Sequence, residues 1–416
     1  MDMEEKGGVS IREYDPSRDS GAVEAVERRC EVGNSAPGKM SLCTHLLGDP
    51  LCRIRHSPPF LMLVAEVGQQ EKEIVGMIRG CIKTVTCGQT LTTNNINNGN
   101  NTITKPPKLS PVSTKLAYIL GLRVSPSHRR MCIGLKLVIK MEEWFKQNGA
   151  EYSYVATEND NAPSLNLFIQ KCSYSKFRTP SILVQPVFAH RFKLPNRVTI
   201  IRLTPTDSET LYRRRFSTTE FFPHDIGAVL KNRLSLGTYV AVPAGSYSAE
   251  SWPGSAAFLA DPPESWAVLS IWNTKEVFTL ELKGACFARR MAVKATRVVD
   301  TALPWLKIPS LPDVFRPFGL HFLYGVGGEG PRAGRMVKAL CAHAHNLARG
   351  SGCGVVVTEV SGAEPLKLAI PHWKRLSCAE DLWCMKRLVE DCGDGPVGDW
   401  TKSPAGPSIF VDPREF

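Results

Sequence analysis

"LAYILGLRVSPSHRRMCIGLKLVIKMEEWFKQNG", residues 116–149, is the stretch from which the fold is best predicted. Its apolar start predicts a β-strand that ends near Val124, and its second half has apolar residues at helical spacing up to Gly149. Between them lie Arg129, Arg130 and several small residues. A helix N-terminus offers unpaired N–H groups and the positive end of the helix dipole, which suit a phosphate. The stretch therefore predicts a strand–turn–helix corner that binds a diphosphate, or else an ordinary basic turn.

Working outward, the N-terminal half alternates predicted strands and helices, which is typical of an α/β fold. The apolar patterns predict strands over 9–14, 58–67, 73–88, 115–124 and 151–157, helices over 16–33 and 161–172, and a final extended segment over 181–190. Residues 88–114 are rich in Asn and Pro and lack this patterning. We expect them to form a disordered insertion within the domain.

The second half repeats this layout. Val9 and Pro16 match Val198 and Pro205, each pair 189 positions apart. Thr157-Glu158 matches Thr358-Glu359, 201 positions apart. Two matches in the same order predict a duplicated module. We expect a first domain over 8–187, a second, degenerate domain over 197–395 and a C-terminal tail over 396–416.

Composition limits the class of protein. The chain has 416 residues, a net charge of +11 and 13 cysteines. No Cys-x-x-Cys pair, secretory signal or apolar run long enough to span a membrane is present. We therefore expect reduced thiols and no membrane partner. The positive charge suits an anionic partner, but charge alone does not support direct DNA binding.

The turn at Arg129–Gly134 resembles motif A of the GNAT acetyltransferases, [Gln/Arg]-x-x-Gly-x-[Gly/Ala]. This resemblance implies a mixed sheet flanked by helices, here as two tandem modules, and acetyl-CoA as the cofactor. Cys132 stands where the family has its first glycine. The residues that the resemblance assigns to the cofactor here are Leu122, Val124, Arg129, Arg130, Met131, Cys132, Ile133 and Gly134.

A second segment, "NAPSLNLFIQKCSYSKF" at 161–177, resembles the family's Asn-x-x-Ala-x-x-Leu-Tyr-x-Lys-x-Gly-Phe pattern. The resemblance implies that Asn161, Ser164 and Phe168 contact the pantetheine arm. Phe168 replaces a tyrosine that often protonates the leaving thiolate, and Ser173 replaces a glycine. Because a CoA thiolate leaves with little help, these departures weaken catalysis without excluding it.

"VEAVERRCEVG" (23–33) and "SLCTHLLGDPLCRIRHSPPFLMLVAEV" (41–67) are similar to the HOOKLESS-type plant N-acetyltransferases. This resemblance implies a regulator of differential growth and of the ethylene and auxin response, located in the nucleus and secondarily in the cytoplasm. The implied acceptor is a protein amine, with histone lysine as one candidate, and chromatin is an implied partner. The alternative is a non-catalytic GNAT-fold scaffold.

The general base is the hardest residue to assign. The strand over 115–124 carries no carboxylate, so we predict Glu158, at the end of the next strand, with Glu31 and Glu66 as alternatives. No metal is expected: Cys341 and His345 share a helix face, but core packing is the better interpretation. Gly325–Gly330 spells a dinucleotide fingerprint, but its position in the repeat favours a degenerate acyl-CoA turn or a plain turn.

Overall fold

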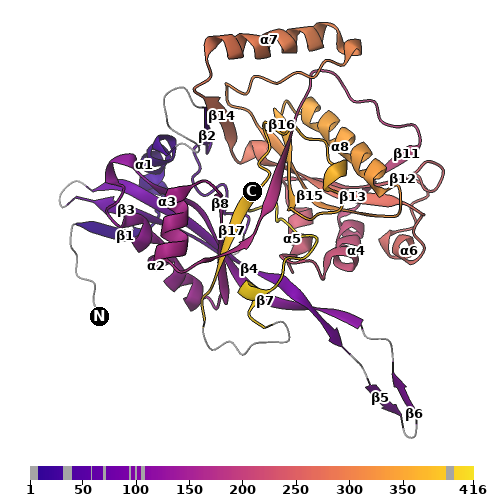
Figure 1. The fold of residues 1–416 in the computed structure, drawn as a ribbon, viewed down its shortest axis with the longest axis horizontal. Coiled ribbons are helices and arrows are strands. Elements are labelled where there is room, and N and C mark those ends of the chain that lie inside the picture. The colour runs from indigo at the N-terminus through magenta and orange to yellow at the C-terminus, as the bar shows by residue number, and fades with distance from the viewer. Residues whose placement is uncertain are drawn as a thin grey trace.

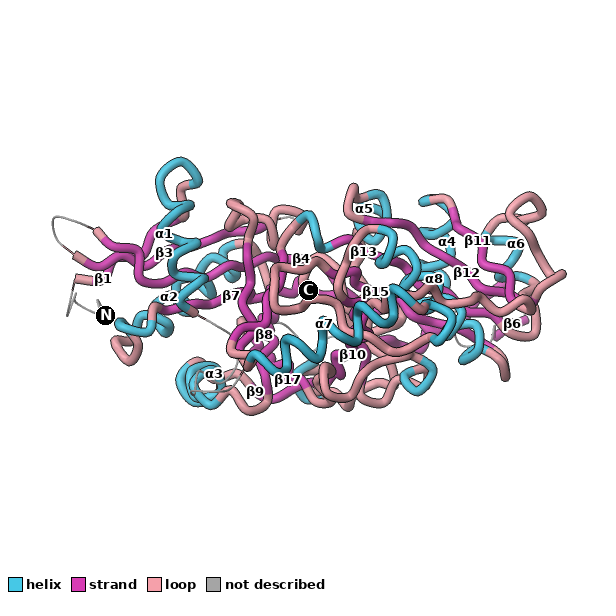
Figure 2. The backbone as a smooth tube through the Cα atoms, turned by 90° about the horizontal axis from the view of Figure 1, so that it is seen from above, coloured by secondary structure: helices cyan, strands magenta, loops and turns pink. Residues whose placement is uncertain are grey.

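The computed structural model describes residues 8–30, 40–57, 59–68, 72–92, 95–98, 101–104, 108–389 and 398–416. Two mixed sheets lie side by side, each with helices packed on it, and the C-terminus lies between them in both views (Figures 1 and 2). This is the predicted α/β fold with two modules.

The first sheet contains seven strands in the order β1-β3-β4-β7-β8-β17-β9. Their bounds are Val9–Glu13, Phe60–Val67, Glu73–Thr92, Lys108–Val124, Tyr152–Glu158, Asp381–Arg387 and Ser175–Arg178. Helices α1 (Pro16–Arg29) and α2 (Ile133–Gln147) pack against alternate side chains of these strands, and therefore cover opposite faces. Gly80 allows close contact with α2, because a Cβ there would lie 2.6 Å from the Met141 sulfur.

The second sheet contains six strands in the order β10-β16-β15-β13-β12-β11. Their bounds are Pro180–Pro186, Val355–Ser361, Leu320–Glu329, Trp266–Asn273, Ser235–Pro243 and Val198–Leu203. The remaining helices are α3 (Ala162–Leu165), α4 (Pro205–Phe216), α5 (Ile226–Lys231), α6 (Ser255–Ala260), α7 (Phe287–Ala302) and α8 (Ala333–Gly350). A separate ladder pairs β2 (Ser41–His45) with β14 (Thr279–Lys283), which links the two halves.

The internal repeat is visible in the backbone. β1 and β11 begin at Val9 and Val198, and α1 and α4 begin at Pro16 and Pro205, as the first sequence match predicts. The second match is wrong. Val155 pairs with Ile119, two residues before Gly121, whereas Thr358 pairs with Leu323, two residues before Gly325. Because both glycines have positive φ within corresponding strands, Thr358 corresponds to Val155 rather than to Thr157.

The two sheets exchange strands across the ranges predicted as domains. β10 lies within the predicted first domain but pairs with β16 in the second sheet. β17 lies within the predicted second domain but pairs with β8 and β9 in the first sheet (Figure 1). Sheet membership therefore does not follow the boundary near residues 187–197, because the two extended segments cross between modules.

The prediction of a disordered insertion over 88–114 is also wrong in part. β4 and β7 form one long antiparallel ladder that continues to the pair Thr92–Lys108. Beyond it, β5 (Asn95–Asn98) pairs with β6 (Asn101–Thr104), away from the body of the molecule (Figure 1). The backbone groups of β4 and β7 hydrogen-bond to each other along this ladder. The ladder therefore does not require an apolar side-chain pattern, and the sequence pattern did not reveal it.

No helix in the described ranges is both long and apolar enough to cross a membrane.

Candidate active site

The first sheet opens between β7 and β8. These neighbours run parallel, and their pairing covers only Leu116–Ile119 with Tyr152–Val155. Beyond this pairing, β7 continues to Val124 and β8 continues to Glu158. Here β8 is paired only on its other side, with β17. The sheet therefore splits at the carboxyl ends of two parallel strands, where α/β folds commonly bind ligands.

A β-bulge lies at this opening. On β4, Met77 pairs with Arg123 and Arg79 pairs with Leu120, so Gly121 and Leu122 together face Ile78. Gly121 has φ +63°, which suits glycine. A bulge leaves one residue outside the ladder, so backbone polar groups near Leu122 point away from β4. This is the strand that carries Leu122 and Val124, which the resemblance assigns to the cofactor.

The predicted turn follows directly. Ser125 donates its N–H to Val75 O at 2.8 Å, and a single 3-10 turn over Pro126–His128 leads to α2. The first helical bond runs from Lys136 N to Cys132 O, and no side chain caps α2. The N–H groups of its first turn are therefore available to a ligand.

Two residues of this turn have left-handed backbone: Arg130 with φ +63° and Cys132 with φ +59°. Cys132 thus adopts the conformation for which glycine is best suited, which explains the family glycine there. The Cys132 side chain is exposed, as is Met131 at 47%. Gly134 is close to α3 and the segment after it, since a Cβ there would lie 3.4 Å from Leu167 Cδ2.

The predicted cofactor residues fall into two groups. Arg129, Arg130, Met131 and Cys132 are exposed on the turn, and Leu122, Val124 and Gly134 are partly exposed around it. Ile133 and Phe168 are instead buried in the core below the turn, at 1% and 2% exposure. Phe168 packs edge-on against Tyr174, with ring centroids 5.3 Å apart, so it supports the site from beneath.

Asn161 lies across the opening, at the start of α3. Its Oδ1 accepts the Ser164 N–H at 3.2 Å, so the side chain caps the short helix. The segment from Asn166 to Lys171 is a π-helix, a feature that is frequent at functional sites.

Comparison with known proteins decides the family. Residues 37–174 match the acetyltransferase (GNAT) family model. Probable N-acetyltransferase HLS1 of Arabidopsis thaliana is 68% identical over 409 residues, covering 98% of this chain and 99% of that protein. Probable N-acetyltransferase HLS1-like, also of Arabidopsis thaliana, is 67% identical over 416 residues, with 98% and 99% covered. The chain belongs to the GNAT acetyltransferase family. The predicted family is confirmed.

The duplicated architecture also has a counterpart. Saccharomyces cerevisiae N-myristoyltransferase with bound myristoyl-CoA, a tandem GNAT-fold protein, aligns with a TM-score of 0.53. The alignment covers 92% of this chain and 80% of that one at 9% identity. At this identity the likeness concerns the fold alone, and it confirms two GNAT modules in one chain.

Two carboxylates of this GNAT protein lie opposite each other where β8 pairs with β17. Glu158, the predicted base, is exposed and pairs across the ladder with Asp381, which is 6% exposed. Burial raises the pKa of Asp381 to about 7, and Glu158 acts in the same direction. Partial desolvation of the Glu158 carboxyl group, and then the Asp160 charge, also raise the pKa of Glu158. Asp381 was missed from sequence because it lies in the range predicted as the second domain, far along the chain from Glu158.

The alternative bases are less suitable. Glu66 is 5% exposed and accepts the Arg12 Nε–H at 2.9 Å, and this bond lowers its pKa. A carboxylate held as a structural ion pair is a weak proton acceptor. Glu31 lies outside the described residues.

The corresponding turn of the second module is closed. Gly330 has φ +86°, and a Cβ there would lie 1.8 Å from Glu264 O. The Arg332 N–H donates to Ser265 Oγ at 3.0 Å, so the chain itself occupies the space before α8. This geometry favours the plain-turn interpretation of Gly325–Gly330.

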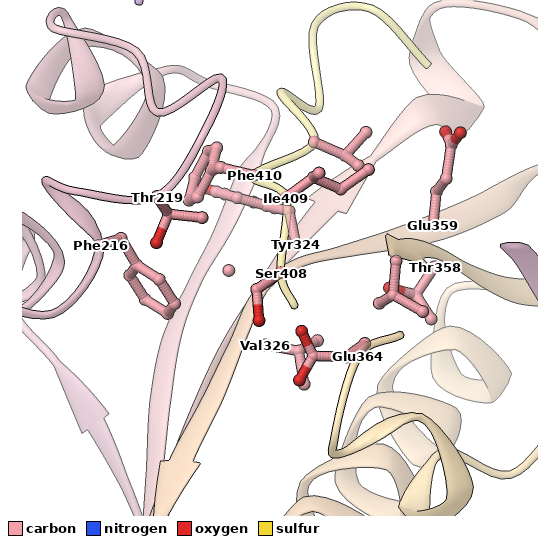
Figure 3. Close-up of a pocket in the computed structure, with 13 residues that line it drawn as sticks. Phe216, Thr219, Tyr324, Val326, Thr358, Glu359, Glu364, Ser408, Ile409 and Phe410 are labelled. Atoms are coloured by element: carbon pink, nitrogen blue, oxygen red, sulfur yellow. The ribbon is translucent and has the colours of Figure 1, made fainter. Parts of the chain in front are cut away.

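The second module also has an opening between parallel strands, β15 and β16. A small hollow lies beside it (Figure 3). Its lining includes Tyr324 and Glu359 from these strands, Glu364 after β16, and Ser408 to Phe410 from the C-terminal segment (Figure 3). The C-terminal segment thus lies along the second opening, whereas the first has a free turn beside it.

Among the described residues, no group of His, Cys, Asp and Glu side chains has the arrangement of a metal site. Cys341 and His345 are buried in α8, and His345 Nε2 accepts the Phe188 N–H at 2.8 Å. Core packing explains both.

Proposed function

We propose that this GNAT protein transfers an acetyl group from acetyl-CoA to the amine of a protein, with histone lysine as one candidate acceptor. The observation that carries the proposal is the opening between β7 and β8, with a bulge at Gly121 and an uncapped helix N-terminus beside it. Acetyl-CoA would supply the activated acyl group as a thioester.

The residues of the turn would bind the cofactor. The uncapped N–H groups of α2 and the charges of Arg129 and Arg130 suit a diphosphate. Val124 and Leu122 would lie along the pantetheine arm, with Asn161 and Ser164 on the other side. The backbone N–H at Leu122 would stabilise negative charge on the carbonyl oxygen.

Proton transfer would use the carboxylates at the end of β8. A base is most effective when its pKa lies near the working pH, and the pKa of Asp381 is raised to about 7. We assign to Glu158, the exposed member of the pair, the deprotonation of the incoming ammonium. Its cross-strand neighbour Asp381 would accept the proton that the amine loses during acetyl transfer. No hydroxyl stands at Phe168, so the thiolate would leave without protonation from that position.

Calorimetric titration of acetyl-CoA tests cofactor binding. Arg130→Glu should weaken binding at least tenfold, because it places a carboxylate beside the diphosphate. Arg335→Glu is the matched control, since it makes the same change in the first turn of α8, where the space is closed. Equal effects of the two variants, or no binding by the unaltered chain, would contradict the proposal.

The cellular role rests on the resemblance to the HOOKLESS-type plant N-acetyltransferases alone. We propose a nuclear protein, with a cytoplasmic fraction, that acts near chromatin in growth and hormone response. Imaging of a fluorescent fusion tests the compartment. Acetylation of a histone H3 tail peptide, measured by mass spectrometry, tests the acceptor.

A non-catalytic scaffold is the second candidate. Cys132 at a left-handed position and Phe168 in place of a hydroxyl favour it. Tight acetyl-CoA binding without transfer to any amine would support this alternative. Transfer at a measurable kcat would reject it.

A further inference from the structure

Three arginines from separate elements meet beside the bulge. Arg79 on β4 and Arg123 on β7 both bond Glu27 of α1: Arg79 Nη1 lies 3.2 Å from Glu27 Oε2, and Arg123 Nε lies 3.1 Å from Oε1. Arg53, from the segment after β2, is near enough for its charge to act on both Glu27 and Arg79. The cluster therefore has three guanidinium groups around one carboxylate.

The hydrogen bonds of this cluster are incomplete. Arg79 is 0% exposed, and its Nη2 has no partner among the described residues. Arg53 Nε is likewise buried without a hydrogen-bond partner among the described residues, and Arg53 has no ion pair there. Its guanidinium lies over the Phe278 ring, 5.0 Å from the ring centroid, and this contact supplies no acceptor for Nε. Burial lowers the pKa of Arg53, and the Arg79 charge acts the same way. Buried charged donors without acceptors are costly, so the arrangement suits an anion that arrives from outside.

The position of the cluster links it to acyl transfer. Arg79 lies against the bulge, since a Cβ on Gly121 would be 2.5 Å from its Nη1. It lies on the face of the first sheet that carries α1, opposite α2 and its N-terminal turn. Residues Gly121 to Val124 are partly exposed, and the Arg123 side chain is 20% exposed. These partly exposed residues of β7 lie between the cluster and solvent, so a ligand would reach the cluster along them.

We propose that Arg79 and Arg53 form an anion subsite that binds a carboxylate or phosphate of the acceptor, close to its reacting amine. This inference rests on the proposed function and narrows its acceptor class. The amine nitrogen forms a bond to the thioester carbon, the C–S bond breaks, the amine proton leaves to a carboxylate of the enzyme, and the thiolate leaves as CoA. The subsite selects which amine is presented. It favours an amine that lies within a few bonds of an acid group over a lysine within a basic tail.

Matched pairs of acceptors test the selectivity. Initial rates of thiol release are measured at saturating acetyl-CoA with acceptors whose α-carboxyl is blocked as an amide: glutamate α-amide against glutamine α-amide, and O-phosphoserine amide against serine amide. We expect kcat/KM to be at least tenfold higher for the acid in one or both pairs. A preference confined to one pair identifies carboxylate or phosphate as the natural anion. Equal rates within both pairs overturn the proposal.

Arg53→Met separates a binding role from a structural one. Removal of an unpaired charge should leave the melting temperature unchanged or raise it, while the acid preference falls at least fivefold. Arg55→Met is the control, since Arg55 is more exposed and pairs with Asp49. Arg79→Lys, which keeps a cation beside Glu27 but removes the guanidinium fork, should also lower the preference. An unchanged preference in both the Arg53 and Arg79 variants overturns the proposal.

A binding measurement separates this inference from the proposed function. The α-amides of glutamate and glutamine are titrated into the chain with and without saturating CoA. Tighter binding of the glutamate amide, lost in Arg53→Met, supports the subsite even where no acetyl transfer occurs. Equal affinities beside intact acetyl-CoA binding reject the subsite alone.

Discussion

At the scale of single residues, Cys132 is the most informative departure from the family pattern. Its backbone is left-handed, with φ +59°, and its thiol is exposed. A residue with a Cβ in this conformation costs about 1–2 kcal/mol relative to glycine. We therefore expect Cys132→Gly to raise the free energy of unfolding by about 1 kcal/mol, measured by urea denaturation.

Cys286→Gly is the control for this variant, because Cys286 is also exposed but has φ −65°. It should be neutral or destabilising. Acetyl-CoA affinity should rise in Cys132→Gly if the thiol crowds the diphosphate, and stay constant if it points away. A loss of stability in Cys132→Gly would contradict the assigned strain.

The sequence predicted the strand, the turn and α2 at this place because each signal was local. The strand, the turn and α2 follow one another without interruption, and the departure at Cys132 could be read directly against a motif. Arg53 and Arg79 could not be found in this way. They are ordinary basic residues in sequence, and only the fold brings them to Glu27 beside the bulge.

At the scale of elements, sequence analysis missed the exchange of β10 and β17 between the two sheets. Each strand is short and lies within the range predicted for the domain whose sheet it leaves. Pairing partners are non-local, so no local pattern assigns β17 to β8. The consequence for the site is Asp381, which this exchange places opposite Glu158.

Asp381 gives stability a specific pH dependence. Its folded-state pKa is raised from 3.8 to about 7 because burial disfavours the charged form. The folded state thus holds the proton more tightly than the unfolded state, and this contribution to stability is present at low pH and lost as pH rises to about 7. Burial, and then Asp381, raise the pKa of Glu359 to about 8. The loss of stability therefore continues to higher pH.

We therefore expect Asp381→Asn to raise the melting temperature at pH 8 and to leave it nearly unchanged at pH 4. Glu380→Gln, the exposed neighbour, should have no such dependence. Scanning calorimetry at the two pH values measures both. If Asp381 is also the proton acceptor, Asp381→Asn lowers kcat at least tenfold at pH 8 despite its higher stability. A variant that is less stable at pH 8 would refute the assignment.

At the scale of the whole molecule, the C-terminal segment joins the two modules. Lys83 of β4 contacts Glu415 at 2.5 Å and Asp412 at 3.5 Å, and Tyr154 Oη donates to Glu415 at 2.6 Å. Arg414 bonds Asp412 and Asp225, each at 2.6 Å. All of these groups except Asp225 are buried. The range predicted as a tail is therefore part of the core between the modules.

A double-mutant cycle tests this junction. Lys83→Met leaves Glu415 and Asp412 buried with less compensation, so the free energy of unfolding should fall by about 3–5 kcal/mol. Lys83→Met combined with Glu415→Gln removes both members of the closest pair and should recover part of that loss. The exposed pair Lys140–Glu143 is the control, and Lys140→Met should cost less than about 0.5 kcal/mol.

The same cycle reports on cooperativity. Because the C-terminal segment and β17 both tie the second half of the chain to the first sheet, the modules should unfold in one transition, followed by tryptophan fluorescence and by circular dichroism. In Lys83→Met the two signals should remain coincident at a lower urea midpoint, since β17 still joins the halves. Separate midpoints would mean that the ion pairs, and not the exchanged strand, couple the modules. A Lys83→Met variant as stable as the Lys140→Met control would mean that the buried pair contributes nothing to the junction.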